Sequence, residues 1–354
     1  MKKIIFSLLT FSITVLSFAQ NFTSGGINYS VTSPTTAQVV DNNSFVGVAT
    51  IPVNVVYNST SYLVTSINFN AFKTCTGLTS ITIPNSVTNI GDSAFKQCTG
   101  LLSVTIPNSV TSIRMSAFAS CSGLTSINIP DSVSILESGV FSFCTSLTSV
   151  VLPNSITMLN AVLFQGCTSL SSVTIPNTIT SIGFYTFADC TGLTSVTIPN
   201  SVTSFGSNAF GGCTNLTSVI IDKAIPIIIN ANLFQNVPYA TATLYVPASS
   251  IAAYEAAPVW TNFNTIASIT LANNNFEKNN KINVYPNPAT NILNISLEEN
   301  TTIDRLTITD ISGKKILEQV GNATIVNIES LAKGMYVLEV FANGNKMVNK
   351  FIKN

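Results

Sequence analysis

Histidine is absent from the 354-residue sequence, and tryptophan occurs only once. Without histidine the chain has no Ser-His-Asp or Cys-His nucleophile pair, no imidazole metal ligand and no general base of the commonest kind. Charge is scarce too, because only 8% of the residues are charged and the 15 basic and 15 acidic side chains cancel. A nucleic-acid-binding protein usually shows a basic stripe, which is missing here. We therefore expect no catalytic residues, no metal, no cofactor and no nucleic-acid partner.

Long hydrophobic runs are missing from residue 20 onward, although 46% of the residues are hydrophobic and the mean hydropathy is +0.43. A membrane-spanning helix needs about 20 consecutive apolar residues. The longest suspicious stretch, residues 224–229, is short and contains Pro226. We expect no membrane span in the mature chain.

Residues 1–19 have the pattern of a secretory signal peptide. Lys2 and Lys3 precede an apolar stretch at residues 4–18, and the small Ala19 provides a cleavage site. The segment is too short to anchor the chain, although an uncleaved helix is the alternative. We predict cleavage after Ala19 and a chain that is secreted or held at the outer cell surface.

Cysteine and phenylalanine recur with one fixed period that both residue types share. The cysteines are Cys75, Cys98, Cys121, Cys144, Cys167, Cys190 and Cys213, and the phenylalanines are Phe72, Phe95, Phe118, Phe141, Phe164, Phe187 and Phe210. Every interval is 23 residues. A fixed period of this length is typical of a solenoid, in which each coil packs only on its neighbours. The fold class is therefore mainly β, with 23-residue coils and a parallel sheet.

One unit, residues 78–100, shows how a coil is built. Leu78-x-x-Ile81-x-Ile83 is half apolar and β-branched, which predicts a short strand that ends at Pro84. Val87 and Ile90 return to the core, and the Ala94, Phe95 and Cys98 positions fill the far side of the coil on a short helical turn. Two further residues, Arg114 and Glu137, occupy the repeat position of Gly91. That position should therefore have ordinary backbone angles and tolerate side chains.

The seven cysteines allow two interpretations. Stacked coils would place neighbouring cysteine Cα atoms about 5 Å apart, which disulfide geometry permits, and an odd number would leave one thiol over. The alternative, which we favour, is a buried column of small apolar side chains. A zinc site is not indicated, because every cysteine stands alone in its coil.

The unit LTSITIPNSVTNIGDSAFKQCTG resembles the BspA-type leucine-rich repeat of bacterial surface proteins. The resemblance covers residues 64–222 and implies a binding or adhesive protein. Residues 20–63 and 223–267 are similar to the caps of such arrays. Caps are physically required, because end coils would otherwise expose apolar faces and open strand edges.

Residues 281–354 hold 15 of the 30 charged side chains, which indicates a second domain after an asparagine-rich linker at residues 268–280. Alternating strands with turns at Gly313, Gly334 and Gly344 predict a small β-sandwich. The motifs Val284-Tyr-Pro-Asn-Pro288 and Leu331-Ala-Lys-Gly-Met-Tyr336 and a lysine-rich final strand are similar to the type A sorting domain of the type IX secretion system. The resemblance implies that residues 281–354 engage secretion machinery, with Gly334 and Tyr336 serving sorting, and that the tail is removed.

Acidic residues in the array are few. Asp131 and Glu137 lie in one coil, and we interpret both as solvated turn residues, with Glu298-Glu299 as a strand end. A Ser–Lys pair is the catalytic arrangement that the composition leaves open, but the array has only Lys73 and Lys96 to supply it.

The outward face of the predicted sheet is the candidate binding surface, because extended solenoid faces commonly bind partners. Its residues are Ser80, Thr82, Ser103, Thr105, Ser126, Asn128, Ser149, Val151, Ser172, Thr174, Ser195 and Thr197. We expect a protein or glycan ligand. A passive spacer is the alternative, since the face carries no aromatic or charged anchor. Ice binding by the hydroxyl column is disfavoured, because Asn128, Val151 and Ile220 interrupt it.

Overall fold

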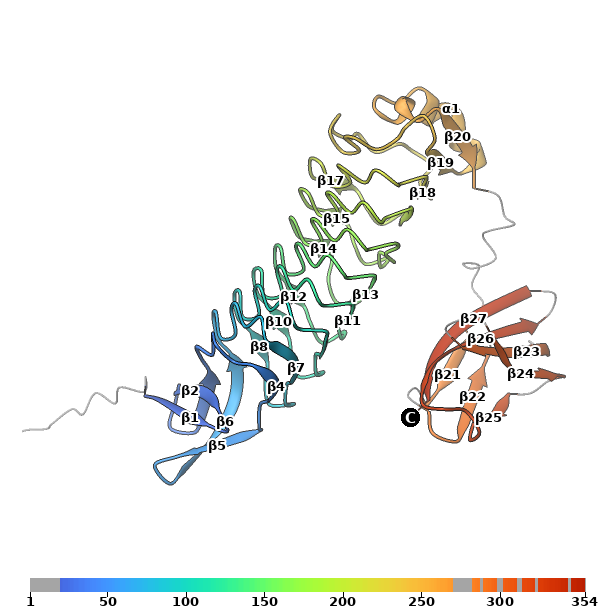
Figure 1. Ribbon diagram of the computed structural model, residues 1–354. Helices are drawn as coiled ribbons and strands as arrows, with labels where there is room; N and C mark the ends of the chain where they lie inside the picture. Colours follow the sequence, from blue (N-terminus) through green and yellow to red (C-terminus); the bar gives the residue numbers. More distant parts are fainter. Residues whose placement is uncertain are drawn as a thin grey trace, which may run out of the picture. The chain divides into compact units, whose positions relative to one another are not determined.

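The computed structural model describes residues 20–269, 282–286, 289–297, 302–310, 314–321, 324–342 and 345–353. The predicted signal peptide, residues 270–280 of the predicted linker, and Gly313, Gly344 and Glu298-Glu299 lie outside the described residues. The chain divides into two compact units, Met1–Ser268 and Ile269–Asn354, which are described separately (Figure 1).

The first unit is a solenoid whose coils contribute strands to two rows, one on each side (Figure 1). The first strand row is β7 (Leu78–Thr82), β9 (Ser103–Thr105), β11 (Ser126–Asn128), β13 (Ser149–Val151), β16 (Ser195–Ile198) and β18 (Ser218–Ile221). The second strand row is β8 (Asn89–Ile90), β10 (Ser112–Ile113), β12 (Ile135–Leu136), β14 (Met158–Leu159), β15 (Ser181–Ile182) and β17 (Ser204–Phe205). The repeat pattern predicted the first row but not the second.

Both rows are parallel and pair equivalent residues of successive coils. Ile81 is opposite Val104 in the first row, and Ile90 is opposite Ile113 in the second. All four side chains are buried. β7 ends at Thr82, two residues before Pro84, as predicted. The period therefore places apolar side chains of successive coils in direct contact along both rows.

The repeated phenylalanines form a continuous column of stacked rings inside the solenoid. From Phe72 to Phe210, neighbouring ring centroids lie 5.0–5.8 Å apart with interplanar angles of 5–11°. Phe234, which breaks the period by one residue, still stacks on Phe210 at 5.5 Å. Every ring of this column is fully buried. Burial of each contributes about 1.5–3 kcal/mol to folding, so the column stabilises the whole array.

The segment that carries the phenylalanines is not the helical turn that we predicted. Phe95 N–H donates to Ala117 O in the next coil at 2.7 Å, while Cys98 N–H donates to Phe95 O of its own coil at 3.1 Å. Two residues of the segment, Ser93 (φ 54°) and Gln97 (φ 63°), have left-handed backbone angles. Left-handed residues and coil-to-coil hydrogen bonds are both incompatible with an α-helix, so the segment is a ladder of turns.

The cysteines form the buried column that we favoured, and all seven thiols are free. Cys98 Sγ donates to Phe72 O of the preceding coil at 3.0 Å, and each later cysteine repeats this bond with Sγ–O distances of 3.1–3.2 Å. Burial raises the pKa of Cys144 to about 12. Cys144 therefore donates to the Phe118 carbonyl of the turn ladder as a neutral thiol.

The Gly91 position has ordinary backbone angles, as predicted, but it is less tolerant than expected. A Cβ on Gly91 would lie 2.8 Å from Phe69 N, and one on Gly183 would lie 2.7 Å from Ala161 N. Contacts this short require the backbone of the preceding coil to move. The coils that carry Arg114 and Glu137 accommodate a side chain at the same position, so the constraint is local close approach and not φ.

Both ends of the solenoid are covered by additional elements. The N-terminal end has β1 (Asn21–Ser24), β2 (Ile27–Val31), β3 (Thr36–Val39), β4 (Gly47–Thr50), β5 (Asn54–Tyr57) and β6 (Thr60–Ile67). β5 and β6 form an antiparallel hairpin. The C-terminal end has β19 (Thr243–Val246), η1 (Ala248–Ser250), α1 (Ile251–Glu255), η2 (Trp260–Asn262) and β20 (Thr265–Ser268). Trp260 is fully buried there, and its Nε1–H donates to Ile227 O at 2.8 Å.

The second unit is a β-sandwich of two antiparallel sheets. One sheet contains β21 (Asn283–Tyr285), β22 (Ile292–Ser296) and β25 (Ile325–Asn327); the other contains β23 (Ile303–Asp310), β24 (Lys315–Val320), β26 (Gly334–Ala342) and β27 (Asn345–Lys353). Tyr336 and Phe351 stack at 5.6 Å in its core. Gly334 is not the turn residue that we predicted, because it already pairs with Lys353 as the first residue of β26.

Candidate functional site

The outward side chains of the first strand row lie in register. Ser80 is opposite Ser103, Thr82 is opposite Thr105, Ser126 is opposite Ser149, and Asn128 is opposite Val151. Of the twelve predicted residues, Ser80 and Ser195 are half-buried and the other ten are exposed. The structure therefore brings the predicted residues together as one strip, which we call the hydroxyl face.

The hydroxyl face is not a continuous sheet. Backbone pairing joins β4, β7 and β9, then β11 and β13, then β16 and the strands that follow it. Between the last two groups, Thr174 makes a single bridge to Thr197, and Ser172 lies outside any strand. The coil that contains Ser172 and Thr174 is the least regular part of the strip.

A hollow of about 530 Å³ adjoins the middle of the hydroxyl face. Asn128 and Val151 line it from the strands, and Asp131 and Asn154 line it from the turns after the repeated prolines. Asp131 Oδ1 accepts from Asn154 N–H at 2.7 Å. The Val151 side chain is 59% exposed. The hollow thus offers an apolar contact beside amide and carboxylate groups, a combination that suits a partner surface.

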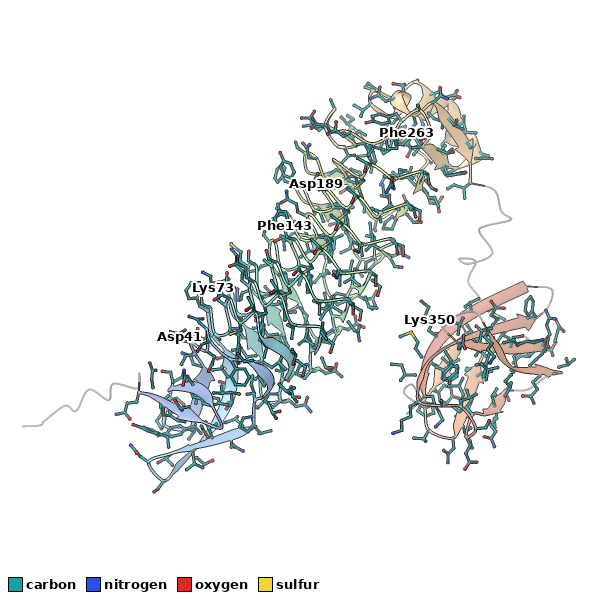
Figure 2. The ribbon with its side chains drawn as sticks, viewed as in Figure 1. Asp41, Lys73, Phe143, Asp189, Phe263 and Lys350 are labelled. Carbon is teal, nitrogen blue, oxygen red and sulfur yellow. The ribbon has the colours of Figure 1, made fainter. Side chains whose placement is uncertain are left out.

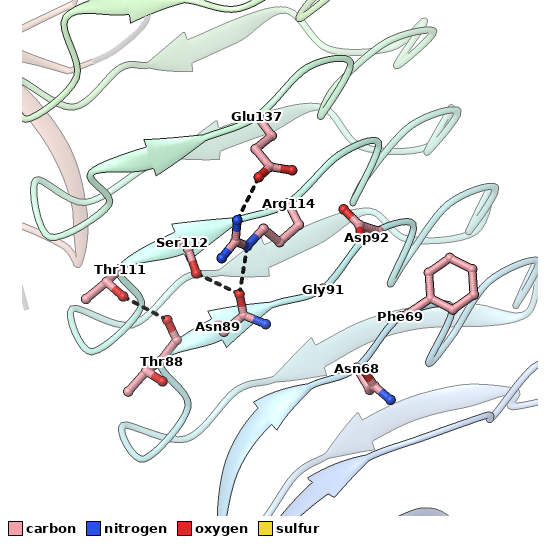
Figure 3. Close-up of a pocket in the computed structure, with 10 residues that line it drawn as sticks. All are labelled: Asn68, Phe69, Thr88, Asn89, Gly91, Asp92, Thr111, Ser112, Arg114 and Glu137. Carbon is pink, nitrogen blue, oxygen red and sulfur yellow. Dashed lines mark hydrogen bonds and ion pairs between the residues drawn. The ribbon is translucent and has the colours of Figure 1, made fainter.

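A second concavity, of about 450 Å³, lies against the second strand row (Figure 3). At its centre Arg114 Nη1 and Glu137 Oε1 are 2.7 Å apart, and the two side chains are 42% and 30% exposed. Glu137 Oε2 also accepts from Met115 N–H at 2.9 Å. Glu137 is therefore held by two partners, which corrects our interpretation of it as a solvated turn residue. Asp131, by contrast, is an exposed turn residue.

The remaining polar groups of this concavity, which we call the Arg114 pocket, are oriented by hydrogen bonds. Asn89 Oδ1 accepts from Ser112 Oγ at 2.6 Å and from Arg114 Nε at 3.4 Å, so the Asn89 amide N–H₂ is left as a donor. Asp92 Oδ1 accepts from Met115 N–H at 2.9 Å, and its second oxygen has no partner within the described part of the chain. The Phe69 ring, which is 59% exposed, completes the pocket.

The Arg114 pocket was not predicted, because its residues do not form a motif along the chain. Arg114 and Glu137 lie one full repeat apart in the sequence and become neighbours only when the repeat units are aligned. In the same alignment Asp92 occupies the repeat position of Phe69. The two coils are joined there, because Asn70 N–H donates to Asp92 O at 3.0 Å. Opposite charges at one repeat position of adjacent coils were the signal that would have predicted the ion pair.

Lys73, at the edge of the turn ladder with Phe143 and Asp189, makes no ion pair among the residues described (Figure 2). Within the described ranges, no group of three or more cysteine or acidic side chains is placed to hold a metal ion. The described helices include none that is long and apolar enough to cross a bilayer.

The comparison with protein families identifies both units. Residues 21–146, 65–193 and 159–313 match the family described as BspA type leucine rich repeat region. The chain belongs to the BspA-type leucine-rich repeat family. Residues 283–354 match the secretion system C-terminal sorting domain. Both resemblances inferred from the sequence motifs are therefore confirmed. No curated protein matches the sequence.

Solved leucine-rich repeat structures resemble the chain. A leucine rich cell surface protein from Faecalibacterium prausnitzii is 28% identical, with a TM-score of 0.54, and the match covers 72% of this chain and 73% of that one. A leucine-rich repeat protein from Bacteroides ovatus is 26% identical with a TM-score of 0.50, covering 70% of this chain and 76% of that one. The T. pallidum leucine rich repeat protein is 30% identical with a TM-score of 0.50, covering 56% and 91% respectively. These matches confirm the solenoid fold.

Proposed function

We propose that this BspA-type repeat protein is exported to the cell surface or the medium and binds a protein or glycan partner without catalysis. The proposal rests on one observation above all: a repeat solenoid with a long exposed strip is joined to a secretion sorting domain. The similarity to a leucine rich cell surface protein supports the location. The signal peptide at residues 1–19, with cleavage after Ala19, and removal of the sorting tail belong to the same proposal.

The hydroxyl face is the surface that we assign to the partner. It combines short Ser, Thr and Asn side chains, which the paired strands hold in place, with the exposed Val151 beside a hollow. Rigid side chains lose little conformational entropy when a partner binds, so even a weakly polar strip can bind a large, matching surface. The expected affinity comes from many small contacts and not from one anchor.

The test is a binding screen of the full chain against matrix proteins and a glycan array. Val151→Asp places a charge at the centre of the hydroxyl face and should abolish binding, because the carboxylate would be desolvated at the interface. The matched control is Met158→Asp, which changes an exposed side chain of the second strand row in the same coil. A wild-type chain that binds nothing, or Val151→Asp and Met158→Asp chains that bind equally, would refute the proposal for this face.

A passive spacer at the cell surface is the second candidate. The observation that favours it is the absence of charged and aromatic residues among the twelve residues of the hydroxyl face, since binding hot spots are usually Trp, Tyr or Arg. Replacing the outward Ser and Thr residues by Asn distinguishes the two. Cell adhesion should fall if the hydroxyl face binds a partner, and it should persist if the solenoid serves only as a spacer.

A further inference from the structure

The Arg114 pocket has the chemistry of a carbohydrate site, and it lies on the opposite strand row from the hydroxyl face. We propose that it binds one uncharged hexopyranose residue of a glycan, with one C–H face of the sugar stacked on the Phe69 ring. The inference rests on the proposed binding function and adds a second site with a defined ligand class. Four observations lead to it.

The first observation is the exposed ring. Phe69 is 59% exposed although every phenylalanine of the internal column is fully buried. An aromatic face is electron-rich and attracts the weakly positive C–H groups of a sugar ring, which also gain from leaving water. Figure 3 shows Phe69 at the turn end of the pocket, on the side of Asp92, with Asn89 and Arg114 on the strand side. An apolar platform next to hydrogen-bonding groups fits a ligand that has one apolar face and a polar rim.

The second observation is a set of polar groups in the same pocket that make no hydrogen bond among the described residues. The Asn89 amide oxygen accepts from Ser112 and Arg114, and its N–H₂ group donates no hydrogen bond among the residues that the structure describes. One Asp92 oxygen is a free acceptor, and neither it nor the Asn68 side chain makes a hydrogen bond within the described residues. A hydroxyl group donates one hydrogen bond and accepts others, so neighbouring hydroxyls of a sugar satisfy donors and acceptors together.

The third observation is the charge of the pocket. Arg114 and Glu137 neutralise each other at 2.7 Å, and Asp92 then leaves the pocket with one net negative charge. An anionic ligand such as a phosphate or a sialic acid would be repelled by Asp92 and would have to compete with Glu137 for Arg114. A neutral ligand meets neither cost.

The fourth observation is preorganisation. Arg114 is fixed by Glu137 and Asn89, and Glu137 is fixed in turn by Met115 N–H. Groups that are already held in place lose little entropy on binding, which is what a small ligand with few contacts requires. A volume of about 450 Å³ is within the ordinary range for small-molecule sites and is enough for one sugar ring.

The chain contains a close control for the stacking ring. Phe184 occupies the same repeat position as Phe69, and the two rings are 58% and 59% exposed. One coil after Phe184, the residue that corresponds to Asp92 is Ser207. Its hydroxyl already accepts a hydrogen bond from Asn230 Nδ2 at 3.0 Å. Phe184 therefore offers the same platform without the free carboxylate oxygen.

The test measures saturation-transfer NMR and calorimetric binding of the methyl glycosides of glucose, galactose, mannose and N-acetylglucosamine to the full chain. We expect at least one to bind, with saturation strongest on its C–H protons. Phe69→Ala should weaken binding about tenfold or more, which corresponds to about 1.4 kcal/mol. Asp92→Asn, which can keep the bond to Met115 N–H but replaces the free acceptor by a donor, should weaken it severalfold. Phe184→Ala should leave the affinity within about twofold of the wild type.

Thermal melts of the three variants establish that each one folds, and all three side chains are on the surface. The inference is overturned if none of the four glycosides binds, if Phe69→Ala and Phe184→Ala bind alike, or if sialic acid or a peptide binds the pocket in place of a neutral sugar. The two proposals fail separately. A chain that binds a partner through the Val151 surface but binds no sugar retains the proposed function and loses only this site.

Discussion

The two strand rows of the solenoid share one core but present different outer surfaces. The hydroxyl face of the first row has small polar side chains in most coils, with no charge among the twelve residues that define it. The outer side of the second row and its adjoining turns carries Phe69, Asp92, Arg114, Glu137 and Phe184, so its residue types vary along the solenoid. The interior positions are repeated because each packs against its own copy in the next coil. On the outside, the first row also repeats its serines, whereas the second row and its turns vary in residue type.

This difference makes the second row the better place for a pocket of defined chemistry. A repeated surface offers a partner the same group in every coil and therefore favours a partner that is long and flat. A surface whose residues differ between coils can combine a ring, an ion pair and a carboxylate at one place, which selects for a ligand of defined chemistry. If the buried and exposed positions of the solenoid differ in this way, matched substitutions at a buried and an exposed position should change the free energy of unfolding by different amounts.

The largest effect should follow from breaking the shared core. Phe141→Ala removes a fully buried ring from the middle of the stacked column and should lower the free energy of unfolding by about 3–5 kcal/mol. The control is Phe143→Ala, two residues later, whose ring is 49% exposed and should cost at most about 1 kcal/mol. Urea unfolding followed by the fluorescence of Trp260 measures both. Equal losses would show that the internal column is not the core.

A smaller loss should come from the close approach of coils beside the second row. A Cβ at Gly206 would collide with the backbone of Phe184 in the preceding coil, so Gly206→Ala should cost about 1–3 kcal/mol. Glu137→Ala, at the same repeat position, removes a half-exposed ion pair and one of the two acceptors of Met115 N–H, which keeps Asp92, and should cost at most about 1 kcal/mol. A Gly206→Ala chain as stable as the wild type would mean that the second row tolerates a side chain in every coil.

The fold was predictable where side chains repeat and unpredictable where they do not. Phe95 and Cys98 were assigned to the core because their copies recur in every coil of the array. The second strand row was missed because strands such as Ser112–Ile113 are too short to show alternation. The turn ladder was mistaken for a helix because its left-handed positions hold residues such as Gln97 in place of glycine.

The candidate sites show the same limit. The hydroxyl face could be predicted because strand alternation assigns its residues to the outside. The Arg114 pocket could not, because it depends on which side chains meet across coils, on the bonds that the Asn89 amide oxygen accepts, and on which carboxylate oxygen of Asp92 is already bonded. Those facts require atomic positions.

Alkaline pH should destabilise the interior without affecting the outer surfaces. The thiol pKa of Cys144 is raised by burial from an ordinary value of 9.0 to about 12, so the unfolded chain loses its proton first as pH rises above 9. The contribution of Cys144 to stability is therefore fully present below pH 9 and falls by about 1.4 kcal/mol per pH unit between pH 9 and pH 12. Urea unfolding at pH 8, 9 and 10 measures the slope. Cys144→Ala should reduce the slope of the free energy of unfolding against pH by the contribution of this one thiol. An unchanged slope would contradict burial of Cys144.

The smallest effect should be a gain in stability on the outer side of the turn ladder. Val162 has a left-handed backbone (φ 52°), which a β-branched residue adopts only with strain, and the same repeat position holds Asn70 and Asn208. Val162→Asn should therefore raise the free energy of unfolding by about 0.5–1 kcal/mol. The matched change Val151→Asn, on an exposed strand of the hydroxyl face, relieves no such strain and should give no gain. If Val162→Asn instead lowers the urea midpoint, packing of Val162 against the Gly139 coil outweighs its backbone strain, and this turn belongs to the repeated interior.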